Sequence, residues 1–85
     1  MNIGYHRDFK KDYKKLSNKL QEKFDEKLIL FQKDQFEPIL NNHALTGKYS
    51  GYRSINITGD LRALYKKDGE EIIFMIIDSH SNLYG

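Results

Sequence analysis

Hydrophobic positions divide the chain into two halves that meet near Pro38, the only proline. Before Pro38, an apolar residue recurs every three or four positions, which places one apolar stripe along a helix. The stripe consists of Phe9, Tyr13, Leu16, Leu20, Phe24, Leu28 and Phe31. This pattern predicts a helical hairpin over residues 8–17 and 19–34, although one long bent helix fits the stripe almost as well.

Capping residues favour the hairpin. Asp8 is a candidate cap for the first helix. Ser17-Asn18, followed by Gln21, has the form of a capping box at the start of a second helix. We therefore expect the chain to break between two helices close to residue 18.

After Pro38 the apolar period drops to two, as in strands. Residues 52–58 alternate in polarity, residues 61–67 are β-prone, and residues 72–78 are almost continuously apolar, which is typical of a strand in mid-sheet. Gly59-Asp60 and Asp68-Gly69 mark tight turns between these segments, and the second pair is a strong hairpin signal. Three antiparallel strands are predicted.

Residues 2–6 can add a strand in front of the helices. The predicted order is then β-α-α-β-β-β, an α+β fold in which a helical hairpin covers one face of a mostly antiparallel sheet of about four strands. With 85 residues the chain is long enough for one small core, so we expect a single domain over residues 1–85.

Composition excludes several classes of protein. The chain has no cysteine, so it has no disulfide framework, no thiolate nucleophile and no cysteine-based zinc site, and a reducing cytoplasm fits. Its longest apolar run has six residues, far below the roughly 20 that span a bilayer, so no membrane association is expected. A net charge of +2 is too small to identify a nucleic-acid-binding protein without other signs.

The candidate chemical groups lie in the second half. His43 sits in a polar loop and His80 follows the last strand; each can exchange a proton near neutrality or be an exposed loop residue. Arg53 and Arg62 lie within strands, where an arginine can grip a phosphate or support an ion pair. Asp60 is either a turn residue or a carboxylate near a site.

Lysines and tyrosines offer a second set of interpretations. The first helix carries a basic run that is either a solvated face or a rail for RNA phosphates: Arg7, Lys10, Lys11, Lys14 and Lys15. Three tyrosines can stack on bases, or can be half-buried strand residues: Tyr49, Tyr52 and Tyr84.

Residues 43–85 resemble the RelE/ParE superfamily of toxins from type II toxin-antitoxin systems, and within it most closely the YafQ group. The resemblance rests on four ordered pieces: an H-x-L-x-G turn at residues 43–47, a G-Y-R strand entry at 51–53, a D-x-x-x-x-Y-K strand at 60–66 and a final H-x-x-L-Y at 80–84. The helical hairpin agrees in kind but not in motif. The order and spacing together make the resemblance fairly specific.

The resemblance implies a cytoplasmic, ribosome-dependent mRNA endonuclease that needs neither metal nor cofactor. In such toxins the 2'-hydroxyl of RNA attacks the adjacent phosphate, and a cognate antitoxin neutralises the enzyme. The toxin alone is expected to be a monomer. Its partners are the antitoxin, the ribosome and mRNA.

The resemblance also assigns roles to residues. It implies that His80 is the general acid, that Tyr84 orients the substrate, and that Arg62 stabilises the transition state. His43 and Asp60 become candidates for proton transfer and for holding the imidazoles, and the choice of base between them stays open. The remaining candidates for substrate binding are Asn56, Arg53, Lys10, Lys11 and Lys14.

Two positions depart from the YafQ pattern. Asn56 stands where the group commonly has another histidine, and Leu61 where it often has tryptophan. Asn56 can hydrogen-bond a phosphate or 2'-hydroxyl but cannot accept a proton. Two alternatives therefore stay open: a ParE-like toxin that inhibits DNA gyrase, which would not need His80, and a catalytically weakened binding module with the toxin fold.

Overall fold

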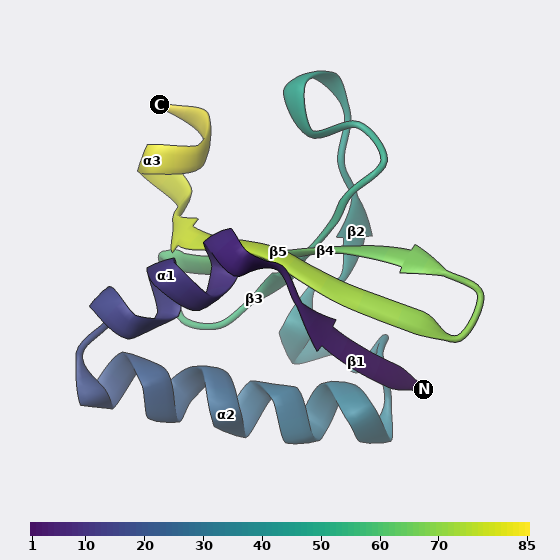
Figure 1. Cartoon of the computed structure of the whole chain (residues 1–85), viewed down its shortest axis with the longest axis horizontal. Coiled ribbons are helices and arrows are strands. Elements are labelled where there is room, and N and C mark those ends of the chain that lie inside the picture. The colour runs from purple at the N-terminus through teal and green to yellow at the C-terminus, as the bar shows by residue number, and fades with distance from the viewer.

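A computed structural model describes residues 1–85 as helices packed on a five-stranded sheet (Figure 1). The helices are α1 (Arg7–Lys15), α2 (Asn18–Lys33) and α3 (His80–Tyr84), with short 3₁₀ turns η1 (Pro38–Leu40) and η2 (Gly47–Tyr49). The strands are β1 (Asn2–Tyr5), β2 (His43–Ala44), β3 (Arg53–Asn56), β4 (Leu61–Asp68) and β5 (Glu71–Ser79). No helix combines the length and apolarity needed to cross a membrane.

The sheet has the strand order β1-β5-β4-β3-β2, in which β1 runs parallel to β5 and every other pair is antiparallel. The predicted α+β fold, helical hairpin and front strand are confirmed, but the sheet has five strands rather than about four. The additional strand is β2, whose two residues pair with Ser54 and Arg53 of β3. Two residues are too few to produce a periodic hydrophobic signal.

The helical hairpin forms because the backbone is extended at two consecutive positions. Leu16 (ψ 149°) and Ser17 (ψ 159°) both leave the helical conformation, so a single bent helix is excluded. The cap of α1 is His6, whose Nδ1 accepts from the backbone N–H of Asp8 at 3.0 Å. The prediction that Asp8 is the cap was wrong, because Asp8 lies inside the first turn, where a carboxylate complements the helix dipole.

Ser17 caps α2, as its Oγ accepts from the N–H of Leu20 at 3.2 Å. Gln21 does not complete a capping box, because it lies four residues after Ser17 rather than three. Its side-chain amide donates instead to the carbonyl of Tyr13 at 2.9 Å. Gln21 therefore joins the start of α2 to the end of α1 and holds the hairpin closed.

The core lies between α1, α2 and the sheet, and Phe74 is at its centre. Four aromatic rings have centroids 5.5–5.7 Å from that of Phe74, namely Phe9, Phe24, Phe31 and Tyr65. All five of these residues are almost completely buried. Aromatic pairs of this kind stabilise by about 0.5–1.5 kcal/mol beyond their burial, so the cluster fixes the hairpin on the sheet.

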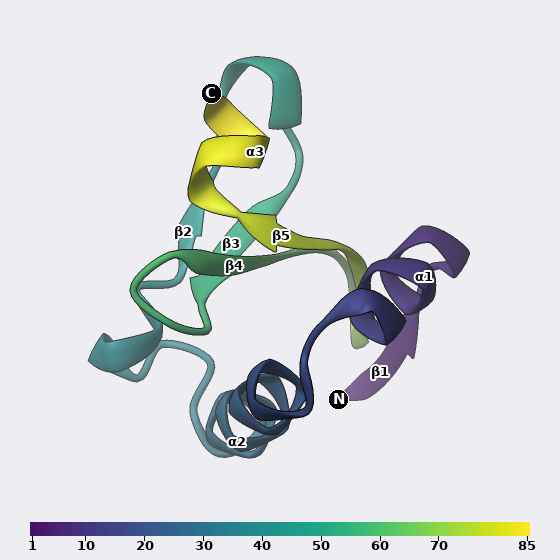
Figure 2. The ribbon, with the colours of Figure 1, turned by 90° about the vertical axis from the view of Figure 1, so that its left-hand side faces the viewer.

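The opposite face of the sheet is covered by other elements. Figure 2 shows α2 on one side of β3 and β4 and α3 on the opposite side, together with the loop that contains η2. A β-bulge in β5 places Tyr65 opposite Phe74 but Leu64 opposite Ile76, which leaves Met75 unpaired. Beyond the bulge, Arg62 lies opposite Asp78 and Asn56. The chain therefore presents polar side chains on the face away from α1 and α2.

Candidate active site

A pocket of about 420 Å³ opens on this second face, between α3, β2 and the sheet. It contains four of the residues that the sequence singled out, from three separate parts of the chain: His43, Arg62, His80 and Tyr84. The remaining lining residues are Asn41, Ala44, Leu45, Thr46 and Ser54. Two imidazoles and one guanidinium thus line a single polar cavity.

His43 is held through one ring nitrogen. Its Nδ1 lies 2.8 Å from the carbonyl oxygen of Asn41, which can only accept, so Nδ1–H is the donor. Asn41 adopts a left-handed conformation (φ 46°), which turns its carbonyl toward the ring. In the neutral imidazole this hydrogen bond leaves the Nε2 lone pair free, as proton abstraction requires.

His80 and Tyr84 come from α3, which follows β5 without a loop. Ser79 caps this helix, because its Oγ accepts from the N–H of Asn82 at 3.1 Å. The rings of His80 and Tyr84 lie one helical turn apart with centroids separated by 4.9 Å. Burial and the neighbouring Tyr49 raise the pKa of the Tyr84 phenol, while Arg62 lowers it. Near neutral pH Tyr84 is therefore a neutral phenol that can donate a hydrogen bond.

Arg62 is oriented by the turn that precedes its own strand. Nη1 donates to the carbonyl of Thr58 at 2.9 Å and to that of Leu61 at 3.2 Å, and Nη2 donates to the carbonyl of Gly59 at 3.2 Å. The turn itself is closed by Thr58, whose Oγ1 accepts from the N–H groups of Asp60 and Leu61. The guanidinium is thus fixed on the wall of the pocket.

Asp60 approaches the site through its main chain. Its carbonyl accepts from the N–H of His80 at 2.8 Å, whereas its carboxylate is exposed and does not line the pocket. The residue therefore joins the β3–β4 turn to α3. Of the two candidate bases, only His43 has its side chain in the cavity.

Asn56 and Arg53 occupy opposite faces of β3. Asn56 lies opposite Arg62, and its buried Oδ1 accepts no hydrogen bond from the rest of the chain. Arg53 lies on the helix-facing side, where its Nε donates to Asn42 Oδ1 at 2.9 Å and its guanidinium covers the ring of Phe36 at 5.5 Å. Neither side chain lines the pocket, and Arg53 contributes to the scaffold.

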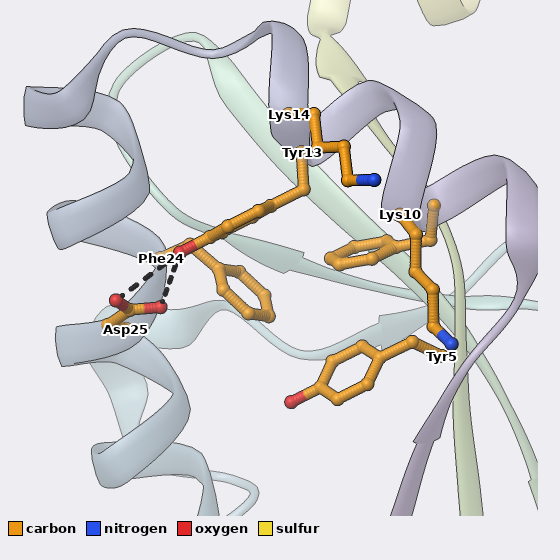
Figure 3. Close-up of a pocket in the computed structure, with 7 residues that line it drawn as sticks. Tyr5, Lys10, Tyr13, Lys14, Phe24 and Asp25 are labelled. Carbon is orange, nitrogen blue, oxygen red and sulfur yellow. Dashed lines mark hydrogen bonds between the residues drawn. The ribbon is translucent and has the colours of Figure 1, made fainter.

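Lys10 and Lys14 lie on the other face of the molecule, at a second cavity of about 300 Å³ between α1, α2 and β1 (Figure 3). Its walls are the rings of Tyr5, Phe9, Tyr13 and Phe24. Tyr13 donates from Oη to Asp25 at 3.0 Å, and burial followed by this contact raises the pKa of its phenol. Lys11 is exposed on the same helix. The sheet separates these lysines from the polar pocket.

Three polar residues of the pocket were not identified from the sequence: Asn41, Thr46 and Ser54. Ser54 is almost completely buried although it is polar. Strand alternation places Ser54 on the same face as Asn56, and this was the signal that could have identified it. Asn41 and Thr46 are ordinary loop residues in the sequence, so no comparable pattern marks them.

Comparison with known proteins places the chain in a family. A family model described as "Bacterial toxin of type II toxin-antitoxin system, YafQ" matches residues 1–85. The fold is similar to that of YafQ from E. coli, with a TM-score of 0.83 and 22% identity over 99% of this chain and 98% of that one.

Two further solved structures share the fold. YafQ in the E. coli DinJ-YafQ toxin-antitoxin complex aligns with a TM-score of 0.80 and 23% identity over 99% of this chain and 97% of that one. A YoeB/ParE toxin from Agrobacterium tumefaciens aligns with a TM-score of 0.75 and 20% identity over 94% of this chain and 99% of that one. No curated protein matches significantly by sequence. Since the family model matches from the first residue to the last, the chain belongs to the YafQ family of type II toxin-antitoxin toxins.

Proposed function

We propose that this toxin is an endoribonuclease that cuts mRNA on the ribosome without a metal or cofactor. The observation that carries the proposal is the meeting of His43, Arg62 and His80 in one pocket. These side chains supply the three needs of RNA cleavage by transesterification: a base, an acid and a fixed positive charge.

In the proposed reaction, His43 Nε2 takes the proton of the 2'-hydroxyl, whose oxygen attacks the adjacent phosphorus. The new O2'–P bond forms as the P–O5' bond breaks, and His80 gives a proton to the leaving O5'. The products are a 2',3'-cyclic phosphate and a 5'-hydroxyl end. Arg62 stabilises the charge on the pentacoordinate phosphate, for which a guanidinium is well suited because it never loses its own charge.

Tyr84 lines the proposed substrate site, and we propose that Asn56, whose side chain does not line the pocket in the free protein, becomes accessible when RNA binds. The Tyr84 phenol lies beside both His80 and Arg62, where it can orient a base or a phosphate oxygen. Asn56 lies opposite Arg62 on the same face and retains an unused acceptor. The absence of a histidine at this position does not leave the site without a base, because His43 fills that role.

A cognate antitoxin is the proposed protein partner, as DinJ is the partner of E. coli YafQ in the related complexes. We further propose that the toxin alone is a cytoplasmic monomer and that Lys10, Lys11 and Lys14 contact ribosomal RNA. These lysines lie across the sheet from the pocket, so they can hold the ribosome while mRNA occupies the catalytic face.

Mapping of RNA ends in cells that express the toxin tests the proposal. The expected result is new 5'-hydroxyl ends within translated codons, which disappear with His80→Ala while the variant still folds and still binds antitoxin. Growth arrest without new mRNA ends, accompanied by DNA damage, would identify a gyrase inhibitor instead. Expression with neither effect would identify an inactive binding module.

A further inference from the structure

A third cavity, of about 330 Å³, adjoins the candidate active site. It shares Thr46 and Tyr84 with the polar pocket of the candidate active site, so the two cavities meet at these residues. Its other lining residues are Lys48, Tyr49, Asn82, Leu83 and Gly85, and none of its side chains is acidic. Nothing in the reaction described above uses Lys48 or Tyr49.

Two tyrosines form a corner in this cavity. The rings of Tyr49 and Tyr84 are perpendicular, with centroids 5.8 Å apart. A planar group stacked on one ring therefore meets the other ring edge to face, which is a favourable arrangement for aromatic groups. Tyr84 is 47% exposed, so much of its ring is available to a ligand.

Positive charge accompanies the aromatic rings. The Nζ atom of Lys48 lies 5.3 Å from the centre of the Tyr49 ring. Next along the loop, the ring of Tyr52 lies 6.0 Å from that of Tyr49, and Lys66 Nζ lies 4.8 Å above it. Alternating aromatic rings and lysines are what a single-stranded nucleic acid needs, since bases stack on the rings and phosphates meet the cations.

The loop that carries Tyr49 is held in shape by its own backbone. Leu45 N–H donates to the Tyr52 carbonyl at 3.0 Å, and Tyr52 N–H donates to the Tyr49 carbonyl at 3.0 Å. Gly47 (φ 67°) and Gly51 (φ 92°) supply the two left-handed positions that the loop requires. A ligand would therefore meet a preorganised surface rather than a loop that must first be ordered.

We propose that this cavity binds the base of the nucleotide next to the cleaved phosphodiester in single-stranded RNA. The inference rests on the proposed nuclease function, because it takes Tyr84 as the boundary between the scissile nucleotide and its neighbour. The base stacks on the ring of Tyr49 and meets the ring of Tyr84 edge to face, and Lys48 contacts the neighbouring phosphate. Tyr52 and Lys66 continue the same surface for the next nucleotide.

The test uses ribosomes programmed with a short mRNA that carries 2-aminopurine, in turn, at each nucleotide of the A-site codon. The codon has 2'-deoxyribose, which prevents cleavage because the attacking hydroxyl is missing. Stacking quenches 2-aminopurine, so the toxin is expected to quench one position strongly. Tyr49→Leu is expected to abolish that quenching and to weaken binding about 5- to 150-fold, the usual range for loss of one base–aromatic stack.

Two controls separate stacking from a change in the fold. Tyr49→Phe keeps the ring and is expected to keep the quenching. Phe36→Leu removes an exposed aromatic ring that lines none of the three cavities and is expected to bind like the wild type. Circular dichroism and urea unfolding establish that each variant is folded before it is compared.

A second mRNA, with an abasic nucleotide at the quenched position, provides a double-mutant cycle. If Tyr49 stacks on that base, Tyr49→Leu causes no further loss with the abasic mRNA. The inference is wrong if the losses of affinity caused by Tyr49→Leu and by the abasic mRNA multiply. It is also wrong if Tyr49→Leu quenches 2-aminopurine as strongly as the wild type. If quenching depends on Tyr49 but natural mRNA is not cut, the nuclease function is refuted while the RNA subsite is retained. If the toxin does not bind programmed ribosomes at all, both proposals are refuted.

Discussion

His80 and Asp60 are joined by a backbone hydrogen bond, in which the N–H of His80 donates to the Asp60 carbonyl at 2.8 Å. This bond ties the start of α3 to the turn whose carbonyls also orient Arg62. A main-chain carbonyl is independent of the side chain. Asp60→Asn is therefore expected to change the mRNA cleavage rate by no more than a few-fold.

His43→Gln is the matched test, because it removes the proposed base, which lies in the pocket. We expect its rate to fall by about 100- to 10,000-fold, the usual contribution of general acid–base catalysis. Single-turnover cleavage of mRNA on purified ribosomes measures both variants. A severe loss in Asp60→Asn together with a mild loss in His43→Gln would assign the base to Asp60.

Arg62 stabilises the turn before β4 and, in the proposed mechanism, also stabilises the transition state. Its guanidinium donates to three backbone carbonyls, so Arg62→Ala is expected to lower the free energy of unfolding by about 1–2 kcal/mol. The chemical step is expected to slow by about 100-fold or more, since a donor to the transition state is lost. Urea unfolding and single-turnover kinetics measure the two effects.

Arg62→Lys keeps the positive charge but lacks the planar guanidinium. Relative to Arg62→Ala, it is expected to recover ribosome binding more fully than cleavage. Losses in Arg62→Ala that are equal in ribosome affinity and in cleavage rate would show that Arg62 only docks the substrate.

Sequence periodicity predicted the helical hairpin and the strands β3, β4 and β5 because their apolar residues repeat along a whole element. It did not predict β2, where two residues pair at a sheet edge, nor the bulge at Met75, which depends on how β4 and β5 fit together. The candidate site was predictable only as a set of residue types, and the structure shows which of them share a pocket. His43, His80 and Arg62 were visible as residue types, whereas the role of the Asp60 carbonyl depends on a hydrogen bond that no side chain reveals.

Substitution of Asn56 tests whether this residue serves substrate binding or the stability of the fold. Its buried Oδ1 has no partner within the chain, which is costly unless a ligand uses it. We expect Asn56→Ala to change the free energy of unfolding by less than about 1 kcal/mol and to slow cleavage about tenfold, the size of one hydrogen bond.

Asn42→Ala is the matched control, because Asn42 hydrogen-bonds Gln35, Arg53 and Tyr65 within the scaffold. It is expected to lose stability and to keep most of its cleavage rate. The opposite pattern in the two variants would make Asn56 structural.

Three lysines of α1 test where the ribosome binds. Replacing Lys10, Lys11 and Lys14 together by Gln is expected to weaken ribosome association and to flatten its dependence on salt, because fewer phosphate contacts release fewer counterions. Replacing Lys19, Lys27 and Lys33 of α2 removes the same charge from a different helix. Ribosome affinity measured at several salt concentrations decides the question. If the α1 and α2 replacements weaken binding equally, the α1 lysines contribute only non-specific electrostatic attraction.

Asp12 links the fold to pH. Burial and then the nearby charge of Asp78 raise the pKa of the Asp12 carboxyl above its ordinary value of 3.8, while Lys15 and the Ile77 N–H oppose the shift. The folded state therefore holds this proton more tightly than the unfolded state, and the contribution of Asp12 to stability falls as pH rises above 3.8.

Asp12→Asn keeps an acceptor for the Ile77 N–H and removes the charge. It is expected to be more stable than the wild type at pH 7, by about 1 kcal/mol or less because the side chain is partly exposed. The difference should disappear at pH 3, where both states of the wild type are protonated at this residue. Urea unfolding at the two pH values measures it, with Glu22→Gln on the exposed face of α2 as the control for charge. A variant that is equally stabilised at both pH values would trace the gain to packing rather than to the charge of the partly buried carboxylate.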